Sequence, residues 1–306
     1  MNSMELSNYL EKMRYGRKLT QEDFVADVVS LRQYQRYRRG ECEIPYEKID
    51  QFAHKLGIPS KKLMNQFESE KNRQLKMVND FYNAVSNRNK PTIKKLKKIL
   101  DEDILIDKET KTYYEYAVLF DEYYNGIHDK PAFARKISNL INYPDILKQE
   151  YFTDIEILIL SSLLIVLSPL QIDTLLRRLS ELFNQEDNIL SSQNNQITSL
   201  IIMRLSKGFG MRGDYSKVIE FTTKGIKHGI AQKQYHLFEY FYYYKALAHF
   251  KLEEYLEYEE ALFRCYNVLH LEGNKNRIEQ FTQLIEKDFD INYHMFIMKY
   301  LKKEIM

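Results

Sequence analysis

The segment from Leu19 to Gly40 constrains the fold of this chain most strongly, because it contains two closely spaced helix-start signatures. Thr20 is followed three residues later by Asp23, and Ser30 is followed three residues later by Gln33. Each pair has the form of a capping box, and the glycine at the end of the segment is a natural residue to follow a helix. The segment is therefore predicted to form two short helices joined by a tight turn.

The second of these helices, about Leu31 to Arg39, contains four arginines and no acidic residue. At about 100° per residue, Tyr34 and Tyr37 fall on one edge, which is predicted to be buried. The opposite, outer side carries Arg32, Gln35, Arg36 and Arg39. Arginine can pair bidentately with guanine and glutamine with adenine, so this outer face suits the reading of a DNA major groove. A solvated basic face is the alternative.

The region from Leu19 to Pro59 resembles a five-helix helix-turn-helix domain of the Xre/Cro type. The most similar pattern is that of the Rgg (MutR-type) and PlcR-like transcription regulators, which residues 28–40 match in register. The resemblance implies that double-stranded DNA is a partner. On the outer face of the second helix, Arg32 and Arg36 are expected to be the main base readers, with Gln35 as a further one. Phosphate or sugar contacts are expected from Lys18, Gln21 and Arg39.

One position departs from the family pattern. The glutamate usually found near the end of the second helix is Arg38 in this sequence. In such domains that glutamate pairs with an arginine of the first helix, which corresponds to Arg14. Two arginines cannot form an ion pair, so a nearby carboxylate such as Glu41 or Glu43 is expected to substitute.

Charge is distributed unevenly along the 306 residues. Residues 1–100 contain 21 lysines and arginines against 12 acidic residues, a net charge of +9. Residues 101–306 contain 24 against 31, a net charge of −7. A basic amino-terminal third on an acidic body points to a polyanionic partner at one end of the chain. The lysine-rich run 94–98 either extends this basic surface or forms the solvated side of a helix.

Cysteine usage and hydropathy favour a reducing cytoplasm. Cys42 and Cys265 lie far apart in the sequence and give no disulfide framework. Cys42 falls in the loop after the second helix, where a symmetric dimer can bring it near its own mate; an inert thiol is the alternative. No signal-peptide pattern opens the chain. The most apolar run, from Ile155 to Leu167, is too short to span a bilayer and is predicted to be a buried helix.

The whole chain is predicted to be all-α, with a helix-turn-helix domain at residues 1–68, a polar linker at 69–75 and a helical repeat domain at 76–306. The repeat domain shows no strand-like alternation. Short turns are predicted at 87–90, 129–130, 143–144, 168–169, 212–214 and 253–254.

Two stretches of the second domain are similar to each other. Residues 203–215 and 243–255 both run from an apolar helix into a small or acidic turn followed by a tyrosine, with a period of about 40 residues. This echo predicts a solenoid of stacked helix pairs resembling tetratricopeptide repeats, with an irregular helical bundle as the alternative. In Rgg and PlcR-like regulators such a domain forms a homodimer and binds a short signalling peptide, so the resemblance implies both partners here.

The same echo predicts where a peptide would bind, because the first helix of each tetratricopeptide-like pair lines the concave side. Tyr240, Tyr243 and Leu247 lie at i, i+3 and i+7 and form one stripe. The repeat alignment adds Met203 and Lys207 from the preceding pair. This set suits a short, largely apolar peptide. The alternative is that the stripe is ordinary core between repeats.

The sequence gives no positive support for catalysis, a cofactor or a metal. The seven histidines form no ligand-spaced cluster, and phosphate-loop, nucleophile-elbow and dinucleotide motifs are missing. We therefore expect a DNA-binding transcription regulator of the quorum-sensing type. Two alternatives stay open: a phage- or plasmid-type regulator whose helical domain only oligomerises, and a helical scaffold that has lost DNA binding. The basic amino-terminal region argues against the scaffold.

Overall fold

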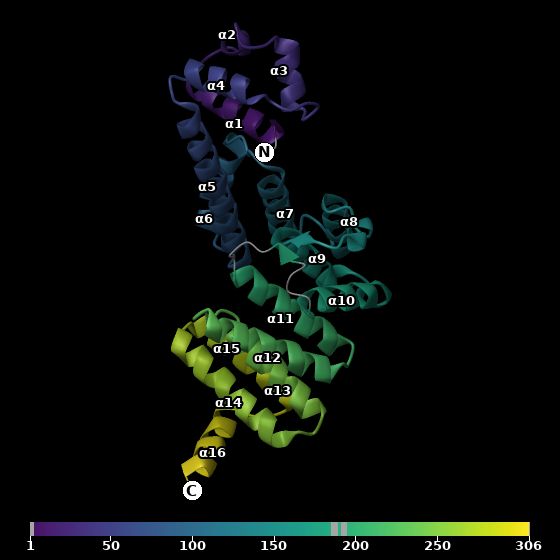
Figure 1. Cartoon of the computed structure of the whole chain (residues 1–306). Coiled ribbons are helices and arrows are strands. Elements are labelled where there is room, and N and C mark those ends of the chain that lie inside the picture. Colours follow the sequence, from purple (N-terminus) through teal and green to yellow (C-terminus); the bar gives the residue numbers. More distant parts are fainter. Residues whose placement is uncertain (1–2, 185–188, 191–194, 306) are drawn as a thin grey trace. The chain divides into compact units, whose positions relative to one another are not determined.

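The computed structural model describes residues 3–184, 189–190 and 195–305 (Figure 1). The chain divides into two compact units, Met1–Asp129 and Lys130–Met306, which are described separately below. The described residues are helical apart from turns and one pair of two-residue strands. The predicted all-α fold, with an amino-terminal helix-turn-helix region and carboxy-terminal helical repeats, is confirmed.

Unit 1 begins with the helix-turn-helix region. Its helices are α1 (Ser3–Gly16), α2 (Gln21–Val25), α3 (Leu31–Arg38), α4 (Tyr46–Lys55) and the first turns of α5 (Ser60–Ser86). The two predicted helix starts are present: the Thr20 side chain accepts a hydrogen bond from the Asp23 backbone, and the Ser30 side chain accepts one from the Gln33 backbone. These caps satisfy backbone N–H groups that the first turn leaves without partners.

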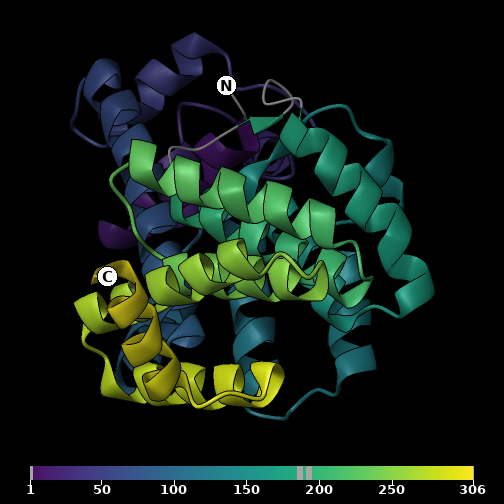
Figure 2. The ribbon, with the colours of Figure 1, turned by 90° about the horizontal axis from the view of Figure 1, so that it is seen from below.

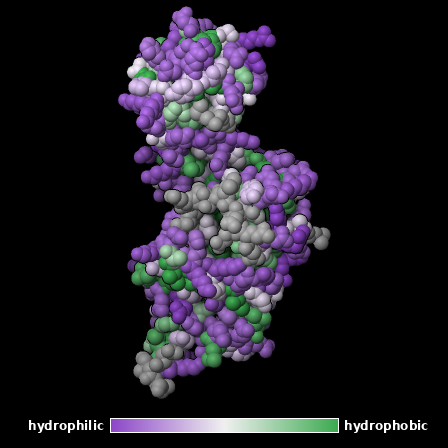
Figure 3. Space-filling view, viewed as in Figure 1, coloured by the Kyte–Doolittle hydropathy of each residue, from purple (hydrophilic) through white to green (hydrophobic). Residues whose placement is uncertain are grey.

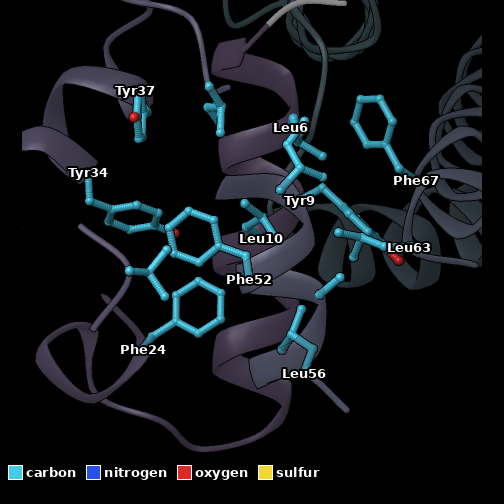
Figure 4. Close-up of a cluster of buried hydrophobic side chains, with 14 of the residues drawn as sticks. Leu6, Tyr9, Leu10, Phe24, Tyr34, Tyr37, Phe52, Leu56, Leu63 and Phe67 are labelled. Atoms are coloured by element: carbon cyan, nitrogen blue, oxygen red, sulfur yellow. The ribbon is translucent and has the colours of Figure 1, made fainter. Parts of the chain in front are cut away.

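An aromatic core holds the helix-turn-helix region together. Phe24, Tyr34 and Phe52, from α2, α3 and α4, have no exposed surface. Their ring centroids lie 5.1 to 6.0 Å apart, within the range of favourable aromatic contacts. Tyr37 is also buried, as predicted, and α1 supplies Leu6 and Leu10 to the same cluster (Figure 4). The buried edge of α3 therefore fixes which of its side chains face outward.

The segment 69–75, predicted to be a linker, lies within the 27-residue helix α5. Its polar side chains contact other parts of unit 1: Glu70 pairs with Lys12 at 2.6 Å, and Lys71 pairs with Glu5 at 2.9 Å. Gln74 is fully buried and accepts a hydrogen bond from the Ile106 backbone. The segment is polar because it docks on α1, so the predicted boundaries differ from the observed units. Unit 1 ends with α6 (Lys90–Glu102) and α7 (Lys108–Tyr124).

Unit 2 starts with α8 (Lys130–Leu140), the 3-10 helix η1 (Asp145–Lys148), α9 (Asp154–Val166) and α10 (Pro169–Asn184). The apolar run is buried in α9, as predicted, and a capping box between Thr153 and Glu156 starts that helix. Two short strands that the sequence did not predict, β1 (Phe152–Thr153) and β2 (Ile189–Leu190), pair in parallel. No helix among the described residues has the length and hydropathy to cross a membrane.

Six further helices follow as three consecutive pairs. They are α11 (Asn195–Met211), α12 (Tyr215–Ala231), α13 (Phe238–Lys251), α14 (Tyr255–Glu272), α15 (Lys275–Phe289) and α16 (Tyr293–Ile305). Consecutive members of α11 to α14 lie side by side (Figure 2). Gly225 allows the close packing of α12 on α13, because a Cβ atom there would lie 2.5 Å from the Phe241 ring. The turns predicted at 212–214 and 253–254 separate members of these pairs.

Candidate nucleic-acid interface

The outer face of α3 carries the predicted base-reading side chains. Arg32, Arg36 and Arg39 are exposed, and Gln35 is half-buried. Ahead of α2, Lys18 is exposed as well. In Figure 3 the surface over the amino-terminal helices is mostly hydrophilic. The structure thus places these five side chains where the sequence predicted them, on the surface of one small helical region.

Two of the three exposed arginines share a carboxylate. Glu41 pairs with Arg39 at 2.6 Å and with Arg36 at 3.6 Å. These pairs are largely exposed, so each contributes at most about 1 kcal/mol and can be exchanged for another anion. Arg32 forms no ion pair with any residue that the structure describes. Within the described part of the chain, the α3 surface therefore has one arginine without an ion pair and two whose exposed pairs with Glu41 a phosphate can replace.

Beneath α3 lies a buried carboxylate that sequence reasoning missed. Glu11 of α1 is 1% exposed. Its Oε1 accepts hydrogen bonds at 2.9 Å from Arg14 Nε and from the Tyr34 hydroxyl. Its Oε2 accepts one from Arg14 Nη2 at 3.0 Å and lies 3.9 Å from Arg38 Nη1. Glu11 therefore joins α1 to α3 and compensates two guanidinium groups.

This arrangement corrects the expectation that Glu41 or Glu43 neutralises Arg14 and Arg38. Glu11 supplies that charge from within α1. The signal was present in the sequence, because Ser7, Glu11 and Arg14 lie at i, i+4 and i+7 and form a buried polar stripe between apolar positions.

The protonation state of Glu11 follows from its surroundings. Burial alone would raise the pKa of Glu11, but the hydrogen bonds from Arg14, Gln21 and Tyr34 and the charge of Arg38 together lower the pKa below its ordinary value. Burial and the neighbouring Glu11 carboxylate raise the pKa of Tyr34. At neutral pH the pair is therefore a carboxylate that accepts and a hydroxyl that donates.

The structure also brings Gln21 and Gln35 together, which the sequence did not predict. Gln21 is the first residue of α2, and its Nε2 donates to Glu11 Oε2 at 3.0 Å. Gln35 Nε2 donates to Gln21 Oε1 at 2.8 Å. Both side chains are half-buried. The predicted phosphate contact and the predicted base reader are thus parts of one hydrogen-bonded chain.

Cys42 lies close to this interface and is half-buried. Its sulfur accepts a hydrogen bond from the Gln33 amide at 3.2 Å and packs against the core of the helix-turn-helix region. Cys265 is buried in unit 2. No three His, Cys, Asp or Glu side chains among the described residues are placed to hold a metal ion.

The residues predicted to bind a peptide fall into two groups. Tyr243 is 4% exposed, donates a hydrogen bond to Asp288, and has its ring 6.0 Å from that of Phe281 on α15. Tyr243 therefore belongs to the core between α13 and α15, the alternative that the sequence left open. Tyr240 is half-buried with its ring 4.9 Å from Phe281.

The other three predicted residues reach the surface to different degrees. Lys207 on α11 is exposed, and Met203 on α11 and Leu247 on α13 are half-buried. None of them lines the cavity of about 580 Å³ that unit 1 contains between α1 and residues 100–115.

Comparison with known proteins shows that this chain shares its fold with several solved structures. No family model matches the chain, and no curated protein matches it. The apo structure of PlcR from Bacillus thuringiensis is 12% identical, with 88% of this chain and 96% of that chain covered and a TM-score of 0.58. ComR from S. thermophilus, in complex with DNA and its signalling peptide ComS, is 12% identical, with 92% and 99% covered and a TM-score of 0.54.

A second ComR structure agrees with these two. The apo form of the competence regulator ComR from Streptococcus vestibularis is 10% identical, with 94% of this chain and 99% of that chain covered and a TM-score of 0.51. At such identities the likeness shows that the fold is shared along most of each chain.

Proposed function

We propose that this chain is a sequence-specific DNA-binding transcription regulator of the Rgg/PlcR type, controlled by a short signalling peptide, and not an enzyme. The observation that carries the proposal is the α3 surface: exposed Arg32, Arg36 and Arg39 on a helix whose opposite edge is buried. The shared fold supports it, since ComR has that fold and its structure holds DNA and a signalling peptide. We place the protein in the cytoplasm, where such DNA lies.

Base reading is assigned to the residues that project furthest from the buried edge of α3. Arg32 is free to pair with a guanine edge, and Arg36 can exchange its 3.6 Å pairing with Glu41 for a base or phosphate. Arg39 and Lys18 lie at the ends of the surface and are assigned to the phosphates, which fix register and orientation.

We expect Arg32→Ala and Arg36→Ala each to weaken binding to the protein's own promoter DNA by about 1–3 kcal/mol and to relax preference at one base position. Arg39→Ala is expected to weaken binding to all sequences alike and to reduce the salt dependence. Fluorescence anisotropy with labelled duplexes at fixed salt measures these effects.

Lys95→Ala is the matched control, because it removes one exposed positive charge from α6 in the same unit. Binding by this variant is expected to stay within about twofold of the parent, since a lone surface charge contributes little. If Lys95→Ala weakened binding as much as Arg32→Ala, the interface would lie on the lysine-rich run instead of α3.

Peptide binding is assigned to the first helices of the repeat pairs. Met203, Lys207, Tyr240 and Leu247 are the side chains of the predicted set that keep accessible surface on α11 and α13. They combine apolar area, a polar tyrosine tip and one positive charge, which suits a short apolar peptide with a carboxylate. Tyr243 supports these helices from the core without touching the ligand.

The protein is expected to form a two-fold dimer, because one helix-turn-helix region buries too little surface to select a genomic site. We expect the dimer contacts mainly within residues 101–306. Sedimentation at micromolar concentration should give twice the chain mass of 36.8 kDa. A monomer that still binds its promoter tightly would contradict this expectation.

The two alternatives give different results in the same assays. A phage- or plasmid-type regulator whose helical domain only oligomerises would bind DNA and dimerise, with no response to any peptide. A scaffold without DNA binding would show no sequence preference, and its affinity would not depend on Arg32.

A further inference from the structure

Three side chains from three helices form a continuous chain of hydrogen bonds beneath the proposed DNA-binding surface. Glu11 on α1 accepts from Gln21 on α2, and Gln21 accepts from Gln35 on α3. The two contacts measure 3.0 and 2.8 Å, both ordinary for N–H···O hydrogen bonds. This series of hydrogen bonds begins at the buried carboxylate of Glu11 and ends at Gln35, on the outer face of α3.

The charge at the buried end fixes the direction of every hydrogen bond in the chain. An ionised carboxylate can only accept, so Gln21 must turn its Nε2 toward Glu11. The Oε1 of Gln21 then faces Gln35, and because a carbonyl oxygen can only accept, Gln35 must present its Nε2 to Gln21. The orientation of both amides therefore follows from the charge on Glu11.

Gln35 keeps its Oε1 and one N–H for other partners. One acceptor beside one donor complements the major-groove edge of adenine, which offers the N6 donor and the N7 acceptor. Guanine offers two acceptors there, and one of them would face the Gln35 oxygen. We infer that Glu11 and Gln21 are positioning residues that hold Gln35 with its adenine-reading edge toward the DNA. This inference rests on the proposed function.

Gln21 is thereby a positioning residue and not a phosphate contact. A glutamine at the start of α2 was expected to contact phosphate or sugar, whereas here both ends of its amide are bound inside the protein. Its contribution is therefore to specificity at one base position.

The test is selection of bound sequences from a random DNA duplex library by the full chain and by Gln21→Met. Methionine keeps the length of the side chain and removes both hydrogen bonds. The wild-type protein is expected to prefer adenine at one position of each half-site by at least about tenfold. Gln21→Met should lose most of that preference at this position alone, and Gln35→Ala should lose it at the same position.

Lys18→Ala is the control, because loss of an exposed lysine should weaken all sequences alike and leave the preferences intact. A Gln21→Met protein that selects the wild-type sequence unchanged would overturn the inference. So would loss of preference at different positions in Gln21→Met and Gln35→Ala. Unfolding curves of both variants establish that the domain is intact.

Failure of the proposed function gives a different result: the wild-type protein enriches no sequence at all. The hydrogen bonds from Glu11 through Gln21 to Gln35 are then tested without DNA, by the side-chain amide NMR signals of Gln35. A change in these signals on Gln21→Met supports the hydrogen-bonded chain, and unchanged signals overturn it.

Discussion

Replacing Glu11 with alanine is expected to lower the free energy of unfolding of unit 1 by about 3–5 kcal/mol. The change leaves the buried Arg14 guanidinium without its carboxylate and the Tyr34 hydroxyl without its acceptor. An uncompensated buried charge costs far more than an exposed pair gains, because the interior cannot solvate it. Urea denaturation followed by circular dichroism measures the loss.

Glu41→Ala is the matched control for this change. It also removes one carboxylate that pairs with two arginines, but those pairs are exposed and should contribute no more than about 1 kcal/mol each. Equal losses for the two variants would contradict the assignment of Glu11 as the charge that holds α1 against α3.

The Glu11 carboxylate is also expected to make the stability of unit 1 depend on pH. Hydrogen bonds and the arginine charges outweigh burial and lower the folded-state pKa of Glu11 below its unfolded value. Its stabilisation is therefore present above the ordinary glutamate pKa and is lost as the pH falls through the lower folded-state pKa. Glu11→Gln should show a weaker loss of stability on acidification than the wild-type protein. Denaturation at a series of pH values measures the difference, and identical pH profiles would contradict it.

The second large effect is expected in the repeats. Tyr243→Ala should lower the free energy of unfolding by about 3–5 kcal/mol, because it removes a buried ring that packs on Phe281 and Phe289. Lys207→Ala should change stability by no more than about 0.5 kcal/mol, because that side chain is exposed. Denaturation curves of the two variants give these values, and calorimetry with candidate peptides gives the affinities.

The two variants separate core from binding surface. Lys207→Ala is expected to lose peptide affinity with the fold intact. Tyr243→Phe, which keeps the ring and removes the hydroxyl that donates to Asp288, is the control for the tyrosine. If Tyr243→Phe kept its stability but lost peptide affinity, Tyr243 would touch the ligand and its assignment to the core would be wrong.

The helix-turn-helix region could be predicted because its signals are local. Thr20 and Ser30 cap their helices through residues three positions away, and Tyr34 and Tyr37 fall on one edge by helical periodicity alone. The outer arginines follow directly once that edge is known. The exposure of Lys18 and Arg39 could be predicted from their positions near the two ends of this segment.

The polar contacts between distant segments could not be predicted in the same way. Residues 69–75 look like a solvated linker, because nothing in their composition reveals that Lys12 and Glu5 lie opposite them. For Glu11, the local spacing from Ser7 and Arg14 marks a polar stripe on α1. Its pairing with Arg38, 27 positions away, could not be predicted, because only the fold brings these two residues together.

In the repeats, periodicity predicted the helices but not their neighbours. Tyr240, Tyr243 and Leu247 form one stripe on α13, and the sequence does not say how much of that stripe the next helix covers. Helix α15 packs over Tyr243, so this part of the stripe is buried. Such assignments require the arrangement of consecutive helix pairs.

The ratio of specific to non-specific DNA affinity, measured by fluorescence anisotropy at physiological salt, tests whether the α3 surface reads DNA. The specific duplex is the sequence that the protein itself enriches from a random library, and the non-specific duplex has the same composition in scrambled order. We predict a ratio of about 10³ or more for the wild-type protein, falling at least tenfold in Arg32→Ala and Arg36→Ala. A ratio near one, or a high ratio that neither substitution changes, would contradict the assignment of the α3 surface as the DNA-reading site.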